Sequence, residues 1–146
     1  MPFLILISVI SPAAAVAVTA PAEAGKTFRG PVEAVVVDVI DGDTFLADAH
    51  IWPGHALRVN IRIRGIDAPE MKARCVVERE AALQARDVLA SLVSQRTVSI
   101  SNIAGAKYYG RVLADVATED GSEIADMLLE QNLVRPYSGG KRRGWC

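Results

Sequence analysis

The sequence lacks the excess of positive charge that usually marks a nucleic-acid-binding surface. Its 16 Lys and Arg residues are balanced by 17 Asp and Glu residues, for a net charge of −1. Any contact with a polyanion must therefore depend on local clusters of basic side chains. Aromatic residues are also scarce, at 5%, but 51% hydrophobic and 23% charged residues suit a globular protein. A chain of 146 residues is long enough for one domain with one core.

Charged residues are missing altogether from residues 3–22, where alanine is abundant. The sequence Ala22-Glu23-Ala24 follows and offers the small-x-small pattern of a signal-peptidase site. We therefore expect residues 1–24 to be a signal peptide and the protein to be exported, either periplasmic or secreted. After cleavage we expect no stable membrane insertion.

Two alternatives to this cleavage site remain. Cleavage after Ala20 is one of them. The other is a membrane anchor formed by residues 3–22, because about 20 apolar residues span a bilayer. Pro12 and Pro21 count against a stable spanning helix.

Cysteine and histidine are both rare, with two residues of each. In an exported chain an even pair favours a Cys75–Cys146 disulfide, with two free thiols as the alternative. Such a bond would close a loop of about 70 residues and stabilise the fold by about 4 kcal/mol. Neither cysteine has the Cys-His arrangement of a catalytic thiol. His50 and His55 flank a turn, and a zinc site would need more ligands, so both are expected on a surface loop.

Alternating apolar and polar residues, separated by turn signals, predict five strands. The turn at Asp41-Gly42 is the strongest of these signals, because glycine accepts the positive φ of tight hairpins. Strands joined in this way favour a small antiparallel barrel of the OB type, in a mainly β member of the α+β class with two to three helices. The expected strands cover residues 32–40, 44–51, 56–66, 96–103 and 111–118.

Helical spacing of apolar residues predicts helices over residues 76–94 and 123–131. The second helix has Ser122 as a plausible N-cap and Asn132 at its C-terminal end. Residues 136–146 are expected to form a loop, so that the domain covers 31–140 and the tail 141–146. In the first helix the expected core face is Val77, Ala81, Ala85, Val88 and Leu92, and the expected exposed face is Glu78, Arg79, Arg86 and Asp87.

Acidic residues and an arginine stand at the ends of the apolar strands. Asp43 follows the first turn, Arg62 lies in the third strand, and Asp67 and Glu70 follow that strand. Strands of this kind present such groups at a shared rim. Clustered acids beside an arginine suit a site that holds a hard cation and a phosphate together.

These residues and their order carry a family resemblance. The motifs are Asp41-Gly42-Asp43-Thr44, Arg62, Asp67-Ala68-Pro69-Glu70 and Tyr109-Gly110-Arg111. Their order and spacing, from residue 32 to residue 137, resemble the staphylococcal nuclease (thermonuclease) family. The resemblance implies a Ca²⁺-dependent phosphodiesterase on an OB-fold barrel, acting on single-stranded or denatured DNA and on RNA. We expect it to act as a monomer.

The resemblance also implies a metal site. Asp43 and Asp67 would bind Ca²⁺ through their carboxylates and Ala68 through its backbone carbonyl. The family usually has Thr where this chain has Ala68, so a hydroxyl contact is lost while the main-chain ligand is kept. Because Ca²⁺ takes six to eight oxygens, water and substrate phosphate must complete the shell. Affinity without substrate is therefore expected to be weak, in the range of about 10⁻⁴–10⁻³ M.

The catalytic roles follow from the same resemblance. Glu70 would be the general base that takes a proton from the attacking water. Arg62 and Arg111 would grip the scissile phosphate, for which the planar fork of arginine suits phosphate oxygens better than lysine does. Tyr109 would hydrogen-bond a neighbouring phosphate.

The chain departs from the family pattern around the substrate. Where the family often has Asp-Lys-Tyr-Gly-Arg, this chain has Lys107-Tyr108-Tyr109-Gly110-Arg111. Either Lys107 replaces the missing phosphate contact or Tyr108 stacks on a base. The aromatic wall for the base is represented by Tyr137 alone. These changes leave the substrate preference open.

Each fragment also has a plain structural interpretation. Asp43 would only complete a turn, and Asp67-Ala68-Pro69-Glu70 would be a polar exit from a strand. Arg62 would lie on a solvated face, and Arg111 would pair with Asp115 or cap a turn. The basic run Lys141-Arg142-Arg143 would either attract phosphate or form a solvated tail. The competing functions are an inactive OB module that binds single-stranded nucleic acid or a protein, and a disulfide-held scaffold. Retained carboxylates favour the enzyme, because without a metal they repel a nucleic-acid backbone.

Overall fold

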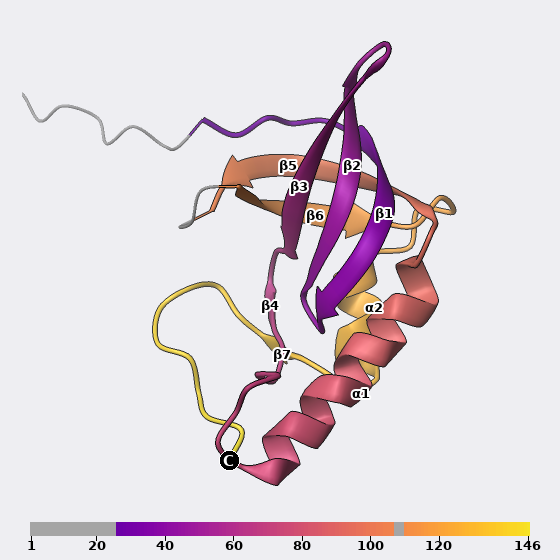
Figure 1. Ribbon diagram of the computed structural model, residues 1–146. Coiled ribbons are helices and arrows are strands. Elements are labelled where there is room, and N and C mark those ends of the chain that lie inside the picture. Colours follow the sequence, from indigo (N-terminus) through magenta and orange to yellow (C-terminus); the bar gives the residue numbers. More distant parts are fainter. Residues whose placement is uncertain (1–25, 107–109) are drawn as a thin grey trace, which may run out of the picture.

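A closed barrel of five strands forms the body of the protein in the computed structural model, which describes residues 26–106 and 110–146 (Figure 1). The strands close in the order β1-β2-β3-β6-β5. Only β3 and β6 run parallel among these neighbours, and the other pairs are antiparallel. The OB-type barrel predicted from the strand pattern is therefore confirmed. Its strands are β1 (Val32–Asp41), β2 (Thr44–Trp52), β3 (His55–Ile63), β5 (Thr97–Gly105) and β6 (Arg111–Ala117).

Two helices and a two-stranded sheet lie at one end of the barrel (Figure 1). Helix α1 (Val76–Val93) packs on β1, and α2 (Ile124–Glu130) packs on β6 and α1. The small sheet pairs β4 (Ile66–Asp67) with β7 (Arg135–Pro136). Neither described helix is long and apolar enough to cross a membrane.

The core is filled by alternate strand residues and by one face of each helix, as period-2 and period-3.6 patterns require. Phe45, Ile61, Ile63 and Ile100 are the large side chains fully buried within the barrel strands. Leu89 of α1 and Leu128 of α2 are fully buried and belong to the same hydrophobic core as the barrel strands.

The third strand is shorter than predicted. It ends at Ile63, and a turn at Arg64 and Gly65 separates it from β4. Gly65 has a φ of +86°, which an L side chain adopts only with strain, so the chain can reverse there. The turn redirects Ile66 and Asp67 away from the barrel and toward β7. The other predicted element boundaries lie within two residues of those observed.

The predicted faces of α1 were partly wrong. Val77, assigned to the core, is 69% exposed, whereas Glu78, assigned to the exposed face, is 8% exposed. The buried face is Glu78, Ala82, Ala85, Leu89 and Val93. Apolar residues stand on two adjoining stripes of this helix, so periodicity alone did not distinguish the stripe that contacts the barrel.

The turn predicted after Asp41 is present, but one detail of it and the predicted cap of α2 were wrong. Gly42 does not have the positive φ expected of it. Ser122 is not the N-cap of α2, because Glu123 takes that position without a side-chain cap. The Ser122 amide instead donates to Asp120 at 3.1 Å. Asn132 does end the helix, with the left-handed φ of 57° that asparagine tolerates.

The predicted disulfide is confirmed. Cys75, directly before α1, is bonded to Cys146 with a Cα–Cα distance of 5.8 Å and a sequence separation of 71 residues. The bond joins the C-terminal end of the tail to the beginning of the helix, and Figure 1 shows these two points together.

Reduction of this disulfide is expected to destabilise the protein by about 4 kcal/mol, because the unfolded chain regains the entropy of a long loop. Thermal unfolding with and without reductant measures the effect as a fall in Tm. The variant with Cys75→Ser and Cys146→Ser should have the lower Tm under both conditions. A wild-type Tm that does not respond to reductant would contradict the prediction.

Candidate functional site

The predicted acidic and basic residues meet at the rim where the β1–β2 turn, the end of β3 and β4 come together. Asp43 stands in the turn, Arg62 lies opposite Thr44 in the β2–β3 register, and Asp67 belongs to β4. Asp43 and Asp67 are buried, with 6% and 4% exposure. Buried carboxylates need compensating partners, because desolvation of a charge is costly.

Arg62 is the partner that joins the two aspartates. Its Nη1 lies 2.7 Å from Asp43 Oδ2, and its Nη2 lies 3.7 Å from Asp67 Oδ1. The same Nη2 donates to the carbonyl of Ile66 at 3.2 Å. The side chain is 19% exposed. Arg62 is therefore not on a solvated face but is held between two acids.

Neighbouring groups fix the Asp43 carboxylate. The amide of Ala68 donates to its Oδ2 at 2.9 Å, and the hydroxyl of Thr44 donates to its Oδ1 at 2.9 Å. The amide of Asp43 in turn donates to Asp41 Oδ1 at 3.0 Å. These bonds connect the first turn directly to the Asp67-Ala68 segment.

Burial, and then the negative charge of Asp43, raise the pKa of Asp41 from 3.8 to about 6. A carboxyl whose folded-state pKa lies above its unfolded value binds its proton more tightly in the native state. Its ionisation therefore lowers folding stability as the pH rises through the interval between these two values.

A further arginine, from the C-terminal tail, completes the cluster. Arg142 Nε lies 2.7 Å from Asp67 Oδ1, and its Nη2 donates to the carbonyl of Ala68 at 3.0 Å. Its Nη1 pairs with the carboxylate of Glu70. The sequence showed only a basic run here, and no local pattern distinguished Arg142 from Lys141 and Arg143.

Glu70 is the most accessible acid of the site. Its side chain is 55% exposed. Its backbone amide donates to the buried Glu78 Oε1 at 3.1 Å, so α1 positions the loop that carries it. Glu78 Oε2 also lies 3.3 Å from Cys146 Sγ. Because the two cysteines are joined as a disulfide, their sulfur atoms offer no thiolate for a metal at this point.

Two further candidate residues, Arg111 and Tyr137, lie on or next to strands that pair with the strands of this cluster. Arg111 begins β6 and lies in register with Asn60 of β3, two residues before Arg62. Asp115, the alternative partner considered for Arg111, is bound by Arg64 at 3.0 Å. Tyr137 follows β7, and its amide donates to Gly65 at 2.9 Å. The remaining candidates, Lys107, Tyr108 and Tyr109, lie outside the described residues.

Position 42 has no room for a side chain, so only glycine fits there without movement of its neighbours. A Cβ on Gly42 would lie 2.7 Å from the Cβ of Ala85 on α1 and 2.9 Å from the Cβ of Ala68. Both distances are well below van der Waals contact. The turn that carries Asp43 therefore touches both α1 and the Ala68 segment.

Gly42→Ala is expected to lower the free energy of unfolding by about 1–3 kcal/mol, because the close neighbours have to move. Urea unfolding measures the change. Gly105→Ala is the matched control, since its Cβ would meet no atom within 4 Å. Equal stability of both variants would show that the turn tolerates a displacement from α1.

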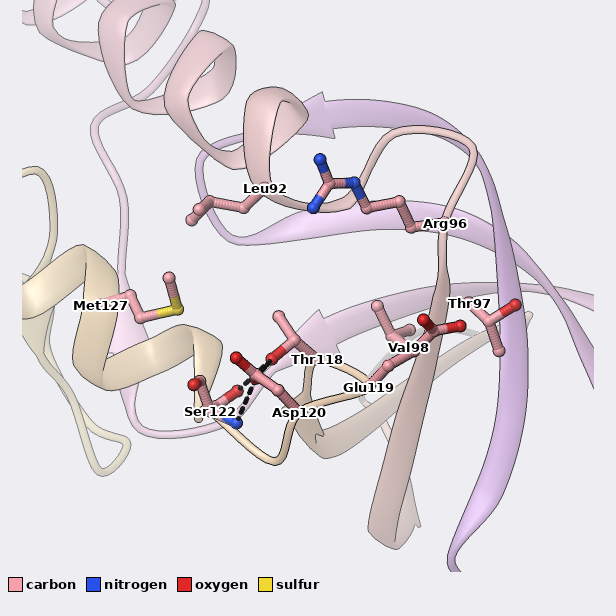
Figure 2. Close-up of a pocket in the computed structure, with 9 residues that line it drawn as sticks. All are labelled: Leu92, Arg96, Thr97, Val98, Thr118, Glu119, Asp120, Ser122 and Met127. Carbon is pink, nitrogen blue, oxygen red and sulfur yellow. Dashed lines mark hydrogen bonds between the residues drawn. The ribbon is translucent and has the colours of Figure 1, made fainter.

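A separate pocket lies between the end of α1, the start of β5 and the loop before α2 (Figure 2). It measures about 310 Å³. Three of its polar residues bind one another: Thr118 and the Ser122 amide both donate to Asp120, and the Thr118 hydroxyl holds the pKa of that carboxyl below its ordinary value. The acid–arginine cluster is therefore the better candidate for chemistry.

The donor atoms of the cluster suit a hard cation. The carboxylates of Asp67 and Glu70 and the carbonyl of Ala68 converge on the positively charged group of Arg142. Oxygen atoms of these types are the ligands that Ca²⁺ prefers. The carboxylate of Asp43 stands beside them, joined to Asp67 through Arg62.

The comparison with protein families agrees with this geometry. The profile described as "Staphylococcal nuclease homologue" matches residues 60–142, which include Arg62, Asp67, Glu70, Arg111 and Arg142. No curated protein gives a significant match to the chain.

Proposed function

The chain belongs to the staphylococcal nuclease family, and from this premise we propose that it is an exported, Ca²⁺-dependent nuclease. It would hydrolyse phosphodiester bonds of DNA, RNA or both with little sequence specificity. The observation that supports this most is the convergence of Asp67, Ala68 and Glu70 on one positive group, beside Arg62. A binding module needs no such arrangement of acids.

In this proposal Asp43, Asp67 and the carbonyl of Ala68 hold Ca²⁺. When bound, the ion supplies positive charge that neutralises the phosphate oxygens. The protein prepares the site in advance, because the Ala68 amide and the Thr44 hydroxyl fix the Asp43 carboxylate.

Glu70 accepts the proton of the water molecule that attacks phosphorus. The new P–O bond forms as the ester bond to one sugar oxygen breaks, and that oxygen leaves with the bonding electrons and takes a proton from water. Arg62 and Arg111 bind the phosphate oxygens and stabilise their charge in the transition state. The contacts of Arg62 with Asp43 and the Ile66 carbonyl orient its guanidinium for this role.

Export is proposed from the apolar N-terminal segment and its cleavage motif. The disulfide supports the same location, because such bonds persist in oxidising compartments. Substrate would be single-stranded or denatured DNA, or RNA, bound by a monomer.

The test is the release of acid-soluble nucleotides from heat-denatured DNA and from RNA. We expect release with millimolar Ca²⁺ and none after addition of a chelator. Binding of DNA without release would favour the inactive OB module. Release that survives chelation would show that the metal assignment is wrong.

A further inference from the structure

The guanidinium of Arg142 stands among the oxygens that the proposed function assigns to cation binding and proton transfer. It contacts the Asp67 carboxylate, the Ala68 carbonyl and the Glu70 carboxylate at the same time. Its side chain is 38% exposed, so water reaches the guanidinium while it contacts these oxygens. A guanidinium and a metal ion oppose each other on these oxygens, because two positive groups that converge on the same ligands repel each other at short distance.

The tail that delivers Arg142 is held at both ends. At its start, β7 pairs with β4, and the Tyr137 amide donates to Gly65 at 2.9 Å. At its end, the Cys75–Cys146 disulfide fixes the chain four residues beyond Arg142. Arg135 links the two ends, since its guanidinium lies 3.8 Å from the Trp145 ring and donates to the Gly144 carbonyl at 2.9 Å.

The position of the arginine is specific within its basic run. Arg142 forms ion pairs with two acids, whereas the described residues include no ion pair of Lys141 or Arg143. A tail attracted by general negative charge would use the three basic residues interchangeably. The tail, held by β7 and by the disulfide, instead places only Arg142 at the site.

We propose that Arg142 is a tethered internal cation that occupies the calcium site and must leave before Ca²⁺ binds. The inference rests on the proposed function, since it names a competitor for the same ligands. The site then has two states, with either Arg142 or the metal ion on the oxygens of Asp67 and Ala68. The apparent affinity for Ca²⁺ is then the intrinsic affinity multiplied by the fraction of molecules in which Arg142 has left the site.

The experiment is calorimetric titration of the purified protein with Ca²⁺, without substrate. Arg142→Ala is expected to bind Ca²⁺ up to about fivefold more tightly than the wild type, as removal of a partly exposed ion pair predicts. Arg143→Ala is the matched control, which removes the same charge from the neighbouring position and should leave the affinity unchanged. An equal effect of both variants would reduce the role of Arg142 to general repulsion and overturn the proposal.

A second variant separates the tether from the charge. Cys146→Ser keeps Arg142 but releases the tail, and it should also tighten Ca²⁺ binding, with no further gain when Arg142→Ala is added. Equal Ca²⁺ affinities of the wild type and Arg142→Ala, or no binding by either protein, would overturn the proposal. Hydrolysis is measured separately: tighter binding by Arg142→Ala without nuclease activity would refute only the proposed function. Ca²⁺-dependent hydrolysis with equal affinities would refute only the role of Arg142.

Discussion

Glu70→Gln is expected to lower the rate of phosphodiester hydrolysis by about 10²–10⁴-fold, the usual contribution of a general base. Glutamine has nearly the same shape but cannot accept a proton from the attacking water. The backbone of this residue keeps its hydrogen bond to Glu78, so the loop should remain in place. Initial rates with denatured DNA at saturating Ca²⁺ measure the loss.

The fold of Glu70→Gln should be almost unaffected, because the side chain is 55% exposed. Its Tm therefore serves as the check that the protein is intact. Glu80→Gln is a matched control on the exposed surface of α1, and it should keep wild-type activity. Full activity of Glu70→Gln would place the base elsewhere.

Arg62→Lys is expected to lower activity nearly as much as the loss of Glu70. Lysine keeps the charge but loses the planar fork that contacts Asp43, Asp67 and the Ile66 carbonyl through two nitrogen atoms. It therefore loses the orientation needed to bind two phosphate oxygens. Turnover should fall while the protein stays folded.

Arg62→Ala goes further, because it leaves buried acids without their shared partner. We expect the free energy of unfolding to fall by about 3 kcal/mol. This is the lower end of the range for a broken buried ion pair, because Arg142 still contacts Asp67. Urea unfolding compares the two variants: Arg62→Lys keeps the positive charge and changes only its geometry, whereas Arg62→Ala removes both.

Arg58→Lys is the control on the same strand. Arg58 pairs with Asp48 but is 61% exposed, so Arg58→Lys should leave the free energy of unfolding almost unchanged. If Arg62→Lys were as active as Arg58→Lys, Arg62 would have no part in phosphate binding.

The barrel could be predicted because the residues within each strand, and the turn next to it, are enough to indicate that strand. Alternation along residues 56–63 and the turn at Asp41-Gly42 are sufficient to indicate hairpins. The meeting of Asp43, Arg62 and Asp67 could be anticipated in the same way, because acidic residues at strand ends gather at a rim. The register of β2 and β3 then places Arg62 beside the first turn.

The place of Arg142 in the site and the burial of Glu78 could not be predicted, because both depend on contacts between distant parts of the chain. Arg142 and Glu70 are 72 residues apart, and the sequence around Arg142 contains only glycines and basic residues typical of a loop. Glu78 is buried because it binds the Glu70 amide, which helical periodicity does not reveal. In both cases a long-range partner decides the environment of a charged residue.

The ends of the described chain lie on different sides of the molecule, and this determines how the protein can be handled. The described chain enters at the barrel end away from α1 and α2 (Figure 1), and there its N-terminal segment is held by the pairing of Phe28 with Ile103. The last residue, Cys146, lies beside Glu78 and the first turn of α1. An affinity tag or surface attachment before residue 26 therefore leaves the acidic cluster open to a polymer. The same addition after Cys146 would start beside the loop of Glu70 and crowd the entrance for a nucleic-acid strand.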